Sequence, residues 1–300
     1  MKVRDEGIWR PPGSPLHFGK PAYGKCSGDP GGRQDNPAQL PTADICAAAR
    51  GLHLDAATFR VLLELQGPSL GLWRAAEIAT LREQVYEPPV LDLGCGDGLV
   101  TSMVLPRVEV GLDPDEKALA QAARRGIYER LEAVPAEETR LADESIGTVV
   151  SNSVLEHLPR IGAVLETVAR VLRPGGRLIF TVPTDAFSRW LVLPLGHYAT
   201  WRNCQLGHIN LWSTEGWIAR LRQVGLEVEE VRPYLRHELV STWDALELLQ
   251  QIWIGRRRLM GIAWRRIPPS MFDRLARWAS QLDLSALQVG GGRLVVARKL

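Results

Sequence analysis

The chain lacks the features of a membrane-spanning, secreted or disulfide-bonded protein. No stretch of its 300 residues approaches the roughly 18 consecutive apolar residues that a membrane-spanning helix needs. Residues 1–6 are mostly charged and do not form the apolar core of a signal peptide. The cysteines are scattered without a C-x-x-C pair, which argues against a disulfide scaffold or structural zinc site: Cys26, Cys46, Cys95 and Cys204. We therefore expect a cytoplasmic protein.

The chain also lacks a large net charge. Its 36 basic and 34 acidic side chains give +2, which argues against a protein that coats nucleic acid. The balance conceals an asymmetry, because residues 251–300 hold ten basic and two acidic side chains, a net charge of +8. Eight of the ten tryptophans follow residue 189. The chain therefore has a mildly acidic first part and a basic, tryptophan-rich end.

The N-terminal part divides into a tail and a helical segment. Residues 1–41 contain seven prolines and seven glycines with few large apolar side chains, which is typical of a disordered tail. Residues 42–87 form the next segment, in which order begins near Leu54. Helical periodicity predicts one helix that ends at Gly67-Pro68 and a second over 69–84.

Strands and helices alternate from residue 88 onward. This pattern predicts a parallel sheet covered by helices on both faces, an α/β fold. The domain comprises residues 88–234 and 292–300, and an insertion at 235–291 precedes its last strand. The expected strands are 90–93, 108–113, 146–151, 177–182, 226–231 and 293–298, and the expected helices are 99–105, 114–125, 161–172 and 213–224, with a turn at 173–176.

The most informative segment is the glycine-rich turn that follows the first strand. Gly94 and Gly96 form a G-x-G turn, where the missing Cβ atoms let a ligand approach the backbone. The next helix directs its free N–H groups at such a ligand. Asp113 ends the following strand, where its carboxylate can accept hydrogen bonds from a ribose diol. This geometry suits a cofactor that contains adenosine.

Two residues near the turn distinguish between such cofactors. A dinucleotide fingerprint needs a small residue at the position that Leu99 occupies. Asp92 lies inside the strand, where its negative charge would repel a pyrophosphate but suits a sulfonium with its ammonium group. The turn therefore favours S-adenosylmethionine over a dehydrogenase cofactor.

Four motifs lie within residues 90–235: VLDLGCGDG, GLDPD, SNSVLEHL and LRPGGRLIFTVPT. Together they resemble class I S-adenosylmethionine-dependent methyltransferases of the type 11 small-molecule group. The resemblance implies a Rossmann-like, seven-stranded, mostly parallel sheet whose last strand is antiparallel. It places Gly94 and Gly96 under the methionine part of the cofactor, Asp92 near its ammonium group and Asp113 at the ribose. It also places four further residues beside the cofactor: Cys95, Pro114, Ser151 and Asn152.

One position departs from the family pattern. Family members usually carry an aspartate near the end of the third strand that contacts the adenine amino group. Pro135 occupies the comparable position, so Glu137 or a backbone carbonyl is the expected substitute.

Methyl transfer needs alignment and exclusion of water more than a conspicuous set of catalytic residues. The candidate bases are His157, just past the fourth strand, and His208. For His157, the alternative is a helix-start residue bonded to backbone. The substrate side is expected at His197, Trp201 and Trp212. Because Cys204 and His208 lack further clustered ligands, no metal site is predicted there.

The insertion at 235–291 is basic and rich in tryptophan. An apolar helical face is predicted from Leu246 to Ile267, through Leu249, Trp253, Met260 and Trp264, with Arg256 and Arg257 beside it and Arg258, Arg265 and Arg266 further round. A second helix is predicted at 271–282. The insertion is either a lid or dimer surface, or a helix on an anionic membrane that would make the protein membrane-peripheral. Nucleic acid is not an expected partner.

The sequence as a whole predicts a methyltransferase that uses S-adenosylmethionine and a small organic or lipid-like acceptor. The alternative is a non-catalytic protein that binds the cofactor, or a partner, on the same fold. The acceptor and the oligomeric state are left open.

Overall fold

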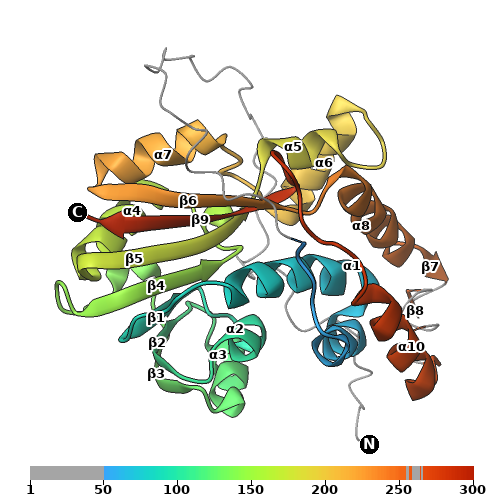
Figure 1. The fold of residues 1–300 in the computed structure, drawn as a ribbon, viewed down its shortest axis with the longest axis horizontal. Helices are drawn as coiled ribbons and strands as arrows, with labels where there is room; N and C mark the ends of the chain where they lie inside the picture. The colour runs from blue at the N-terminus through green and yellow to red at the C-terminus, as the bar shows by residue number, and fades with distance from the viewer. Residues whose placement is uncertain (1–50, 255–256, 259–263, 265) are drawn as a thin grey trace, which may run out of the picture.

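A seven-stranded sheet forms the centre of the computed structural model, which describes residues 51–254, 257–258, 264 and 266–300. The strand order is β3-β2-β1-β4-β5-β9-β6, in which β9 alone is antiparallel to its neighbours (Figure 1). This confirms the expected fold class. The bounds are β1 Val90–Leu93, β2 Val108–Leu112, β3 Tyr128–Glu132, β4 Ile146–Asn152, β5 Leu172–Pro183, β6 Leu226–Tyr234 and β9 Gly292–Lys299. The expected tail, residues 1–41, lies outside the described residues.

Apolar side chains that point alternately to the two faces of the sheet explain why helices pack on both faces. In β5, Leu178 and Phe180 belong to one core cluster, and Ile179 between them belongs to another. The first cluster packs against α4 (Ile161–Val171) and α7 (Thr214–Gln223), and the second against α2 (Leu99–Val104) and the end of α1 (Ala56–Arg82). Ser213 caps α7 by accepting a hydrogen bond from the Gly216 N–H, as its sequence predicts. The sheet is therefore buried on both faces.

Several expected elements differ in detail. The expected helix at 114–125 is α3 (Glu116–Ala122) with a 3₁₀ turn at Ala123–Arg125. The expected turn at 173–176 lies within β5, as an irregularity in its pairing with β4. Two further helices, α5 (Asp185–Arg189) and α6 (Gly196–Leu206), occupy the segment expected to form the substrate side.

Helix α1 consists of two helical halves joined at a kink, which confirms the predicted break between two helices. Its N-cap, Asp55, accepts a hydrogen bond of 2.8 Å from the Thr58 N–H. The kink lies at the expected break, where Gly67 has φ +79° and Pro68 has no N–H to donate. The two halves diverge at this point, so the second half lies along the sheet while the first half packs against α10 (Pro269–Ala279).

The prediction of one helical face from Leu246 to Ile267 is wrong. Helix α8 (His237–Gln250) ends first, and two short strands follow, β7 (Trp253–Ile254) and β8 (Arg257–Arg258). The run Ile252-Trp253-Ile254 is β-branched and aromatic, which favours an extended chain. Arg256, Met260 and Arg265 lie outside the described residues. The second predicted helix is confirmed as α10.

A third core joins the insertion to the N-terminal helix. Its buried side chains come from α1, α5, α8 and α10 and include Phe59, Leu239 and Phe272. It lies beyond the ends of the strands, beside the sheet (Figure 1). In the part of the chain that the structure describes, no helix combines the length and apolarity needed to cross a membrane.

Candidate functional site

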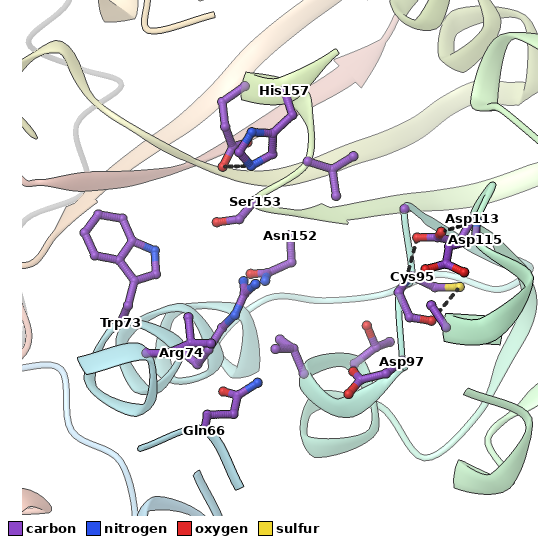
Figure 2. A pocket seen from close by; sticks show the side chains of 18 of the residues that line it. Gln66, Trp73, Arg74, Cys95, Asp97, Asp113, Asp115, Asn152, Ser153 and His157 are labelled. Carbon is purple, nitrogen blue, oxygen red and sulfur yellow. Dashed lines mark hydrogen bonds and ion pairs between the residues drawn. The ribbon is translucent and has the colours of Figure 1, made fainter. Parts of the chain in front are cut away.

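A cavity of about 580 Å³ opens at the carboxyl ends of β1, β2 and β4. Ligands bind at this edge in open α/β sheets, because the strand order reverses there. Figure 2 shows two groups of lining residues. Asp97, Asp113 and Asp115 lie in what we call the glycine-turn half, and Trp73 and His157 lie in what we call the aromatic half.

The glycine-rich turn brings bare backbone to the cavity. The N–H groups of Gly94 and Cys95 both donate to the Leu112 carbonyl oxygen, at 2.8 and 2.9 Å. Gly94 has φ +74°, and a Cβ there would lie 2.6 Å from the Val154 side chain. A Cβ on Gly96 would meet no described atom within 4 Å, so its open side faces the cavity. The turn therefore requires glycine at Gly94 for space and leaves room for a ligand at Gly96.

Acidic side chains dominate the glycine-turn half. Asp113 is fully buried and accepts hydrogen bonds from the N–H groups of Gly96 and Asp115, at 2.9 and 2.8 Å, and burial raises its pKa. Burial also raises the pKa of Asp92 to about 6, although the Tyr128 hydroxyl donates to it at 2.6 Å. Lys117 is the one cation among the described residues that line this half. Such a half favours a ligand that carries positive charge and hydroxyl donors.

Other residues expected beside the cofactor lie at different depths. Cys95 lines the cavity, and burial raises the pKa of its thiol. Asn152 lines the cavity and accepts a hydrogen bond from the Thr181 hydroxyl at 2.9 Å. Ser151 is fully buried in β4 and donates to the Leu93 carbonyl oxygen at 3.0 Å, so its hydroxyl does not reach the cavity. Pro114 is likewise absent from the described lining residues.

The substitute expected for the adenine contact is also outside the cavity. Pro135 precedes a 3₁₀ turn, Ala136–Glu138. The Glu137 carboxylate forms an ion pair of 2.8 Å with Arg160, and neither Pro135 nor Glu137 is among the described lining residues.

A buried carboxylate from α1 is hydrogen-bonded to four residues that line the cavity, and sequence reasoning missed it. Glu77 accepts hydrogen bonds from Trp73 Nε1 at 2.8 Å, Arg74 Nη1 at 2.6 Å and Asn152 Nδ2 at 3.1 Å, and another from the Ser153 hydroxyl. These bonds hold α1 against the end of β4. No local motif marks Glu77, because the two partners outside its own helix, Asn152 and Ser153, are distant in the sequence.

His157 and His208 come together in the aromatic half, with ring centroids 5.4 Å apart. Burial lowers the pKa of both imidazoles, that of His208 to about 3. His157 also makes the backbone bond of the alternative interpretation, to the Gly207 carbonyl oxygen at 3.0 Å. Glu156 lies beside them at 1% exposure, and burial raises its pKa to about 8. This acidic neighbour was not among the expected site residues.

An aromatic wall bounds the same half. Trp73, Phe187 and Trp243 have ring centroids 5.4 to 5.5 Å apart and all line the cavity. They come from α1, α5 and α8, so the N-terminal helix and the insertion both contribute. The wall provides an apolar, planar surface for a ligand.

The three residues expected on the substrate side lie elsewhere. His197, in the first turn of α6, is exposed, and Trp201 on the same helix is 48% exposed. Trp212 packs on Trp217 with ring centroids 4.8 Å apart, under the guanidinium of Arg220. The described cavity lining includes none of them. Residue patterns do not determine the rotation of α6 about its axis or the packing of the segment that follows it. The three residues were therefore expected at the cavity but lie outside its described lining.

Comparisons with known proteins agree with this geometry. Residues 91–180 match the family model described as "Methyltransferase domain". The chain is 37% identical over 93 residues to a ubiquinone biosynthesis O-methyltransferase of Agrobacterium fabrum, covering 29% of this chain and 37% of that protein. It is 39% identical over 97 residues to the protein of that name from Rhizobium etli, covering 30% and 39%. The chain thus spans less than half the length of these relatives.

Solved structures share the fold at low identity. A Thermotoga maritima protein titled as an S-adenosylmethionine-dependent methyltransferase aligns with TM-score 0.51 and 16% identity, over 81% of this chain and all of that one. A geranyl diphosphate methyltransferase aligns with TM-score 0.52 and 16% identity, over 86% and 88%. The expected resemblance is confirmed: residues 91–180 match the model of a methyltransferase domain, and the chain shares the fold of these solved structures.

Proposed function

We propose that this chain, which contains a methyltransferase domain, transfers a methyl group from S-adenosylmethionine to a small organic acceptor. The observation that carries the proposal is that the glycine-rich turn and the aromatic wall line one and the same cavity. The matched relatives are named as O-methyltransferases, which supports a hydroxyl acceptor. When bound, the cofactor supplies an electrophilic methyl group on a positively charged sulfur.

The glycine-turn half fits that cofactor. The open backbone at Gly96 admits a ligand at close range, and Asp92 is a buried carboxylate that a cationic sulfonium and ammonium would stabilise. Asp113 accepts two backbone hydrogen bonds and keeps lone pairs for a ribose diol. We assign these three residues to cofactor binding, with Gly94 shaping the turn.

The aromatic half fits an acceptor that is apolar and carries a few polar groups. Among the described atoms, five buried polar atoms on lining residues have no hydrogen-bond partner. One is Asp97 Oδ2 in the glycine-turn half, and the others are Gln66 Oε1, Arg74 Nε, Glu156 Oε2 and Trp243 Nε1. Buried polar groups normally have hydrogen-bond partners, so a bound molecule with donors and acceptors would supply the missing ones. We propose that the aromatic wall packs on the acceptor and that His157 and His208 contact its reacting group. The chain's own contribution is then alignment and exclusion of water.

Calorimetry with S-adenosylmethionine and its demethylated product, S-adenosylhomocysteine, tests the cofactor assignment. We expect both to bind, and Asp113→Ala to weaken binding at least tenfold. Asp143→Ala is the matched control, because this aspartate is 72% exposed and is not among the described residues that line the cavity. Failure of both ligands to bind the wild-type chain would overturn the proposal.

Methyl transfer itself is tested with labelled S-adenosylmethionine and extracts of metabolites and lipids. We expect label in a small hydroxylated product, and less label with Trp73→Ala, which removes part of the wall. Binding of the cofactor without any labelled product would instead favour the non-catalytic alternative.

We further propose that α10 rests on an anionic membrane surface, which a lipid-like acceptor would require. Its outward face exposes Met271 and Trp278, at 47% and 62%, together with Arg274 and Arg277. Apolar and aromatic side chains flanked by arginine are typical of interfacial helices. We expect the chain to co-sediment with vesicles that contain phosphatidylglycerol, and Arg274→Glu/Arg277→Glu to abolish this. Arg124→Glu, an equally exposed charge reversal in the 3₁₀ turn after α3, should leave it unchanged.

A further inference from the structure

The most unusual group in the cavity is the triad of Glu156, His157 and His208, which we infer to be a binding site for a divalent transition-metal ion such as Zn²⁺. One candidate ligand atom from each residue lies within 4.8 Å of the others. The site would sit in the aromatic half, away from the residues assigned to the cofactor. Its role in methyl transfer rests on the proposed function, whereas the binding of the ion does not.

Each imidazole has one nitrogen available for an ion. His157 Nδ1 lies 3.0 Å from the Gly207 carbonyl oxygen, and His208 Nδ1 lies 3.2 Å from Asn203 Oδ1. Because both partners are acceptors, each Nδ1 carries the proton and each Nε2 keeps its lone pair. Histidines that bind metals usually donate their other N–H to a carbonyl in this way, which fixes the ring.

The partners of the two imidazoles are themselves held in place. Asn203 donates from its amide nitrogen to the Ser188 hydroxyl at 2.8 Å, which orients its oxygen toward His208. Gly207 ends α6 with φ +73°, and its carbonyl faces His157. Both rings are therefore oriented before any ion arrives.

The backbone assembles the triad from distant segments. The carbonyl oxygen of Glu156 accepts hydrogen bonds from the N–H groups of Ile209 and Asn210, at 2.8 and 2.9 Å. Asn210 also donates to the carbonyl oxygens of Leu155 and Leu158, at 2.8 Å each. These bonds hold the segment around His208 beside Glu156, so the three ligands do not depend on a flexible loop to meet.

The described residues satisfy the Glu156 carboxyl group only in part. It is 1% exposed, and its Oε2 has no hydrogen-bond partner among the described residues. Its Oε1 lies 3.6 Å from His157 Nε2. Arg74, the nearby cation, forms its close ion pair with Glu77 at 2.6 Å, and its charge acts on Glu156 only from a greater distance. A buried carboxyl group is costly without a partner, and a dication between it and the two imidazoles would provide one.

Geometry and ligand type indicate which ion fits. Ligand atoms around a tetrahedral Zn²⁺, at about 2.0–2.2 Å from the metal, lie roughly 3.3–3.5 Å apart, so closing the triad needs shifts of about 1.5 Å at most. Two nitrogens and one oxygen suit Zn²⁺ or Co²⁺, whereas Mg²⁺ and Ca²⁺ prefer oxygen ligands alone. Three protein ligands leave a fourth position open, as in catalytic zinc sites.

The open position would take the acceptor's hydroxyl oxygen. A bound dication lowers the pKa of such a hydroxyl, so its proton leaves to water before the transfer. The oxygen then forms a bond to the methyl carbon while the carbon–sulfur bond breaks. The sulfur keeps that electron pair and becomes a neutral thioether, so charge and atoms balance.

Titration of the full chain with Co²⁺ and Zn²⁺ after treatment with a chelator tests the inference. We expect one equivalent of Co²⁺ to bind with the visible absorption of a four- or five-coordinate ion, to be displaced by Zn²⁺, and not to be displaced by excess Mg²⁺. Glu156→Gln and His208→Gln should each weaken binding more than about 100-fold, because loss of a ligand's hydrogen-bond partner alone costs about 10–100-fold. His197→Gln, the same change at an exposed histidine outside the cavity, should have no effect.

Two further measurements distinguish the loss of a metal ligand from misfolding of a variant. Asn203→Ala leaves all three ligands in place and should weaken Co²⁺ binding by about 10–100-fold. S-adenosylhomocysteine binding by each variant reports whether it folds, and separates failure of this inference from failure of the proposed function. Absence of stoichiometric Co²⁺ binding, or binding that survives both ligand substitutions, would overturn the metal site.

Discussion

At the scale of single residues, Asp92 shows a conflict between folding and binding. It lies in a buried strand, and burial raises the pKa of its carboxyl group from 3.8 to about 6. The folded state therefore holds this proton more tightly than the unfolded chain. The group's contribution to stability is full below about pH 4 and is lost as the pH rises through about 6.

Asp92→Asn should consequently stabilise the ligand-free protein at neutral pH. The expected gain at pH 7.5 is roughly 3 kcal/mol at most, since each unit of pKa shift is worth about 1.4 kcal/mol. At pH 4 the variant and the wild type should have equal stability, and chemical denaturation at both pH values measures this. The same variant should bind S-adenosylmethionine more weakly. A gain that persists at pH 4 would contradict the assignment of the effect to ionisation.

The backbone conformation at Gly94 determines which side chains this position tolerates. Gly94→Ala places a Cβ in a left-handed backbone and within 2.6 Å of Val154, so we expect a loss of about 1–3 kcal/mol and weaker cofactor binding. Gly162→Ala is the matched substitution in α4, where the new Cβ meets no described atom and φ is not in that region. It should be neutral or stabilise by up to about 1 kcal/mol. Thermal denaturation with and without S-adenosylhomocysteine measures both.

At the scale of elements, one buried carboxylate hydrogen-bonds α1 to the carboxyl end of β4. Glu77 on α1 takes hydrogen bonds from its own helix and from the segment after β4, and it forms the ion pair with Arg74. This buried carboxylate therefore helps to set the orientation of α1 and the positions of Trp73 and Arg74 in the cavity.

Glu77→Gln should cost about 3 kcal/mol or more, because it leaves the Arg74 guanidinium without its counter-charge. Glu64→Gln is the control on the same helix. This side chain is 34% exposed and pairs with Arg60 at 2.9 Å, so its loss should cost less than about 0.5 kcal/mol. The shift of the guanidinium chloride midpoint reports both effects. Equal shifts would show that Glu77 does not hold α1.

The elements also show which features of the fold and the site could be predicted from the sequence. Six of the seven strands, the glycine-rich turn and Asp113 could be predicted because their signals are local: apolar runs, closely spaced glycines and the spacing to the next strand end. The edge strand β3 was missed because its residues are mostly polar and none is buried. Glu77 and the pairing of Glu156 with His208 could not, because only the packing of distant segments brings them together. His197 and Trp201 were misplaced for the same reason, since a residue pattern does not give the rotation of α6. The assignments of Asp92, Gly96 and Asp113 to the cofactor remain predictions.

At the scale of the whole molecule, the insertion and the N-terminal helix are one unit with the sheet. Trp73 of α1 packs in the core that includes Phe272 of the insertion, and Leu81 of α1 packs on the sheet itself. The core beside the strand ends is therefore not independent of the sheet.

This arrangement predicts a single cooperative unfolding transition for the part of the chain that the structure describes. Phe272→Ala, at 7% exposure, should cost about 3–5 kcal/mol and shift the whole transition. Far-ultraviolet circular dichroism and tryptophan fluorescence should report the same midpoint for the wild type and for the variant. Two resolved transitions, of which only one moves, would mean that the insertion folds on its own.

The position of β9 has a consequence for synthesis. Of the seven strands it comes last along the chain, yet it lies between β5 and β6 and pairs with both. Until residues 292–299 leave the ribosome, β5 and β6 have unpaired edges that no other strand of the sheet can cover. A nascent or prematurely terminated chain would thus expose two strand edges to its neighbours, which favours aggregation and makes it a substrate for chaperones.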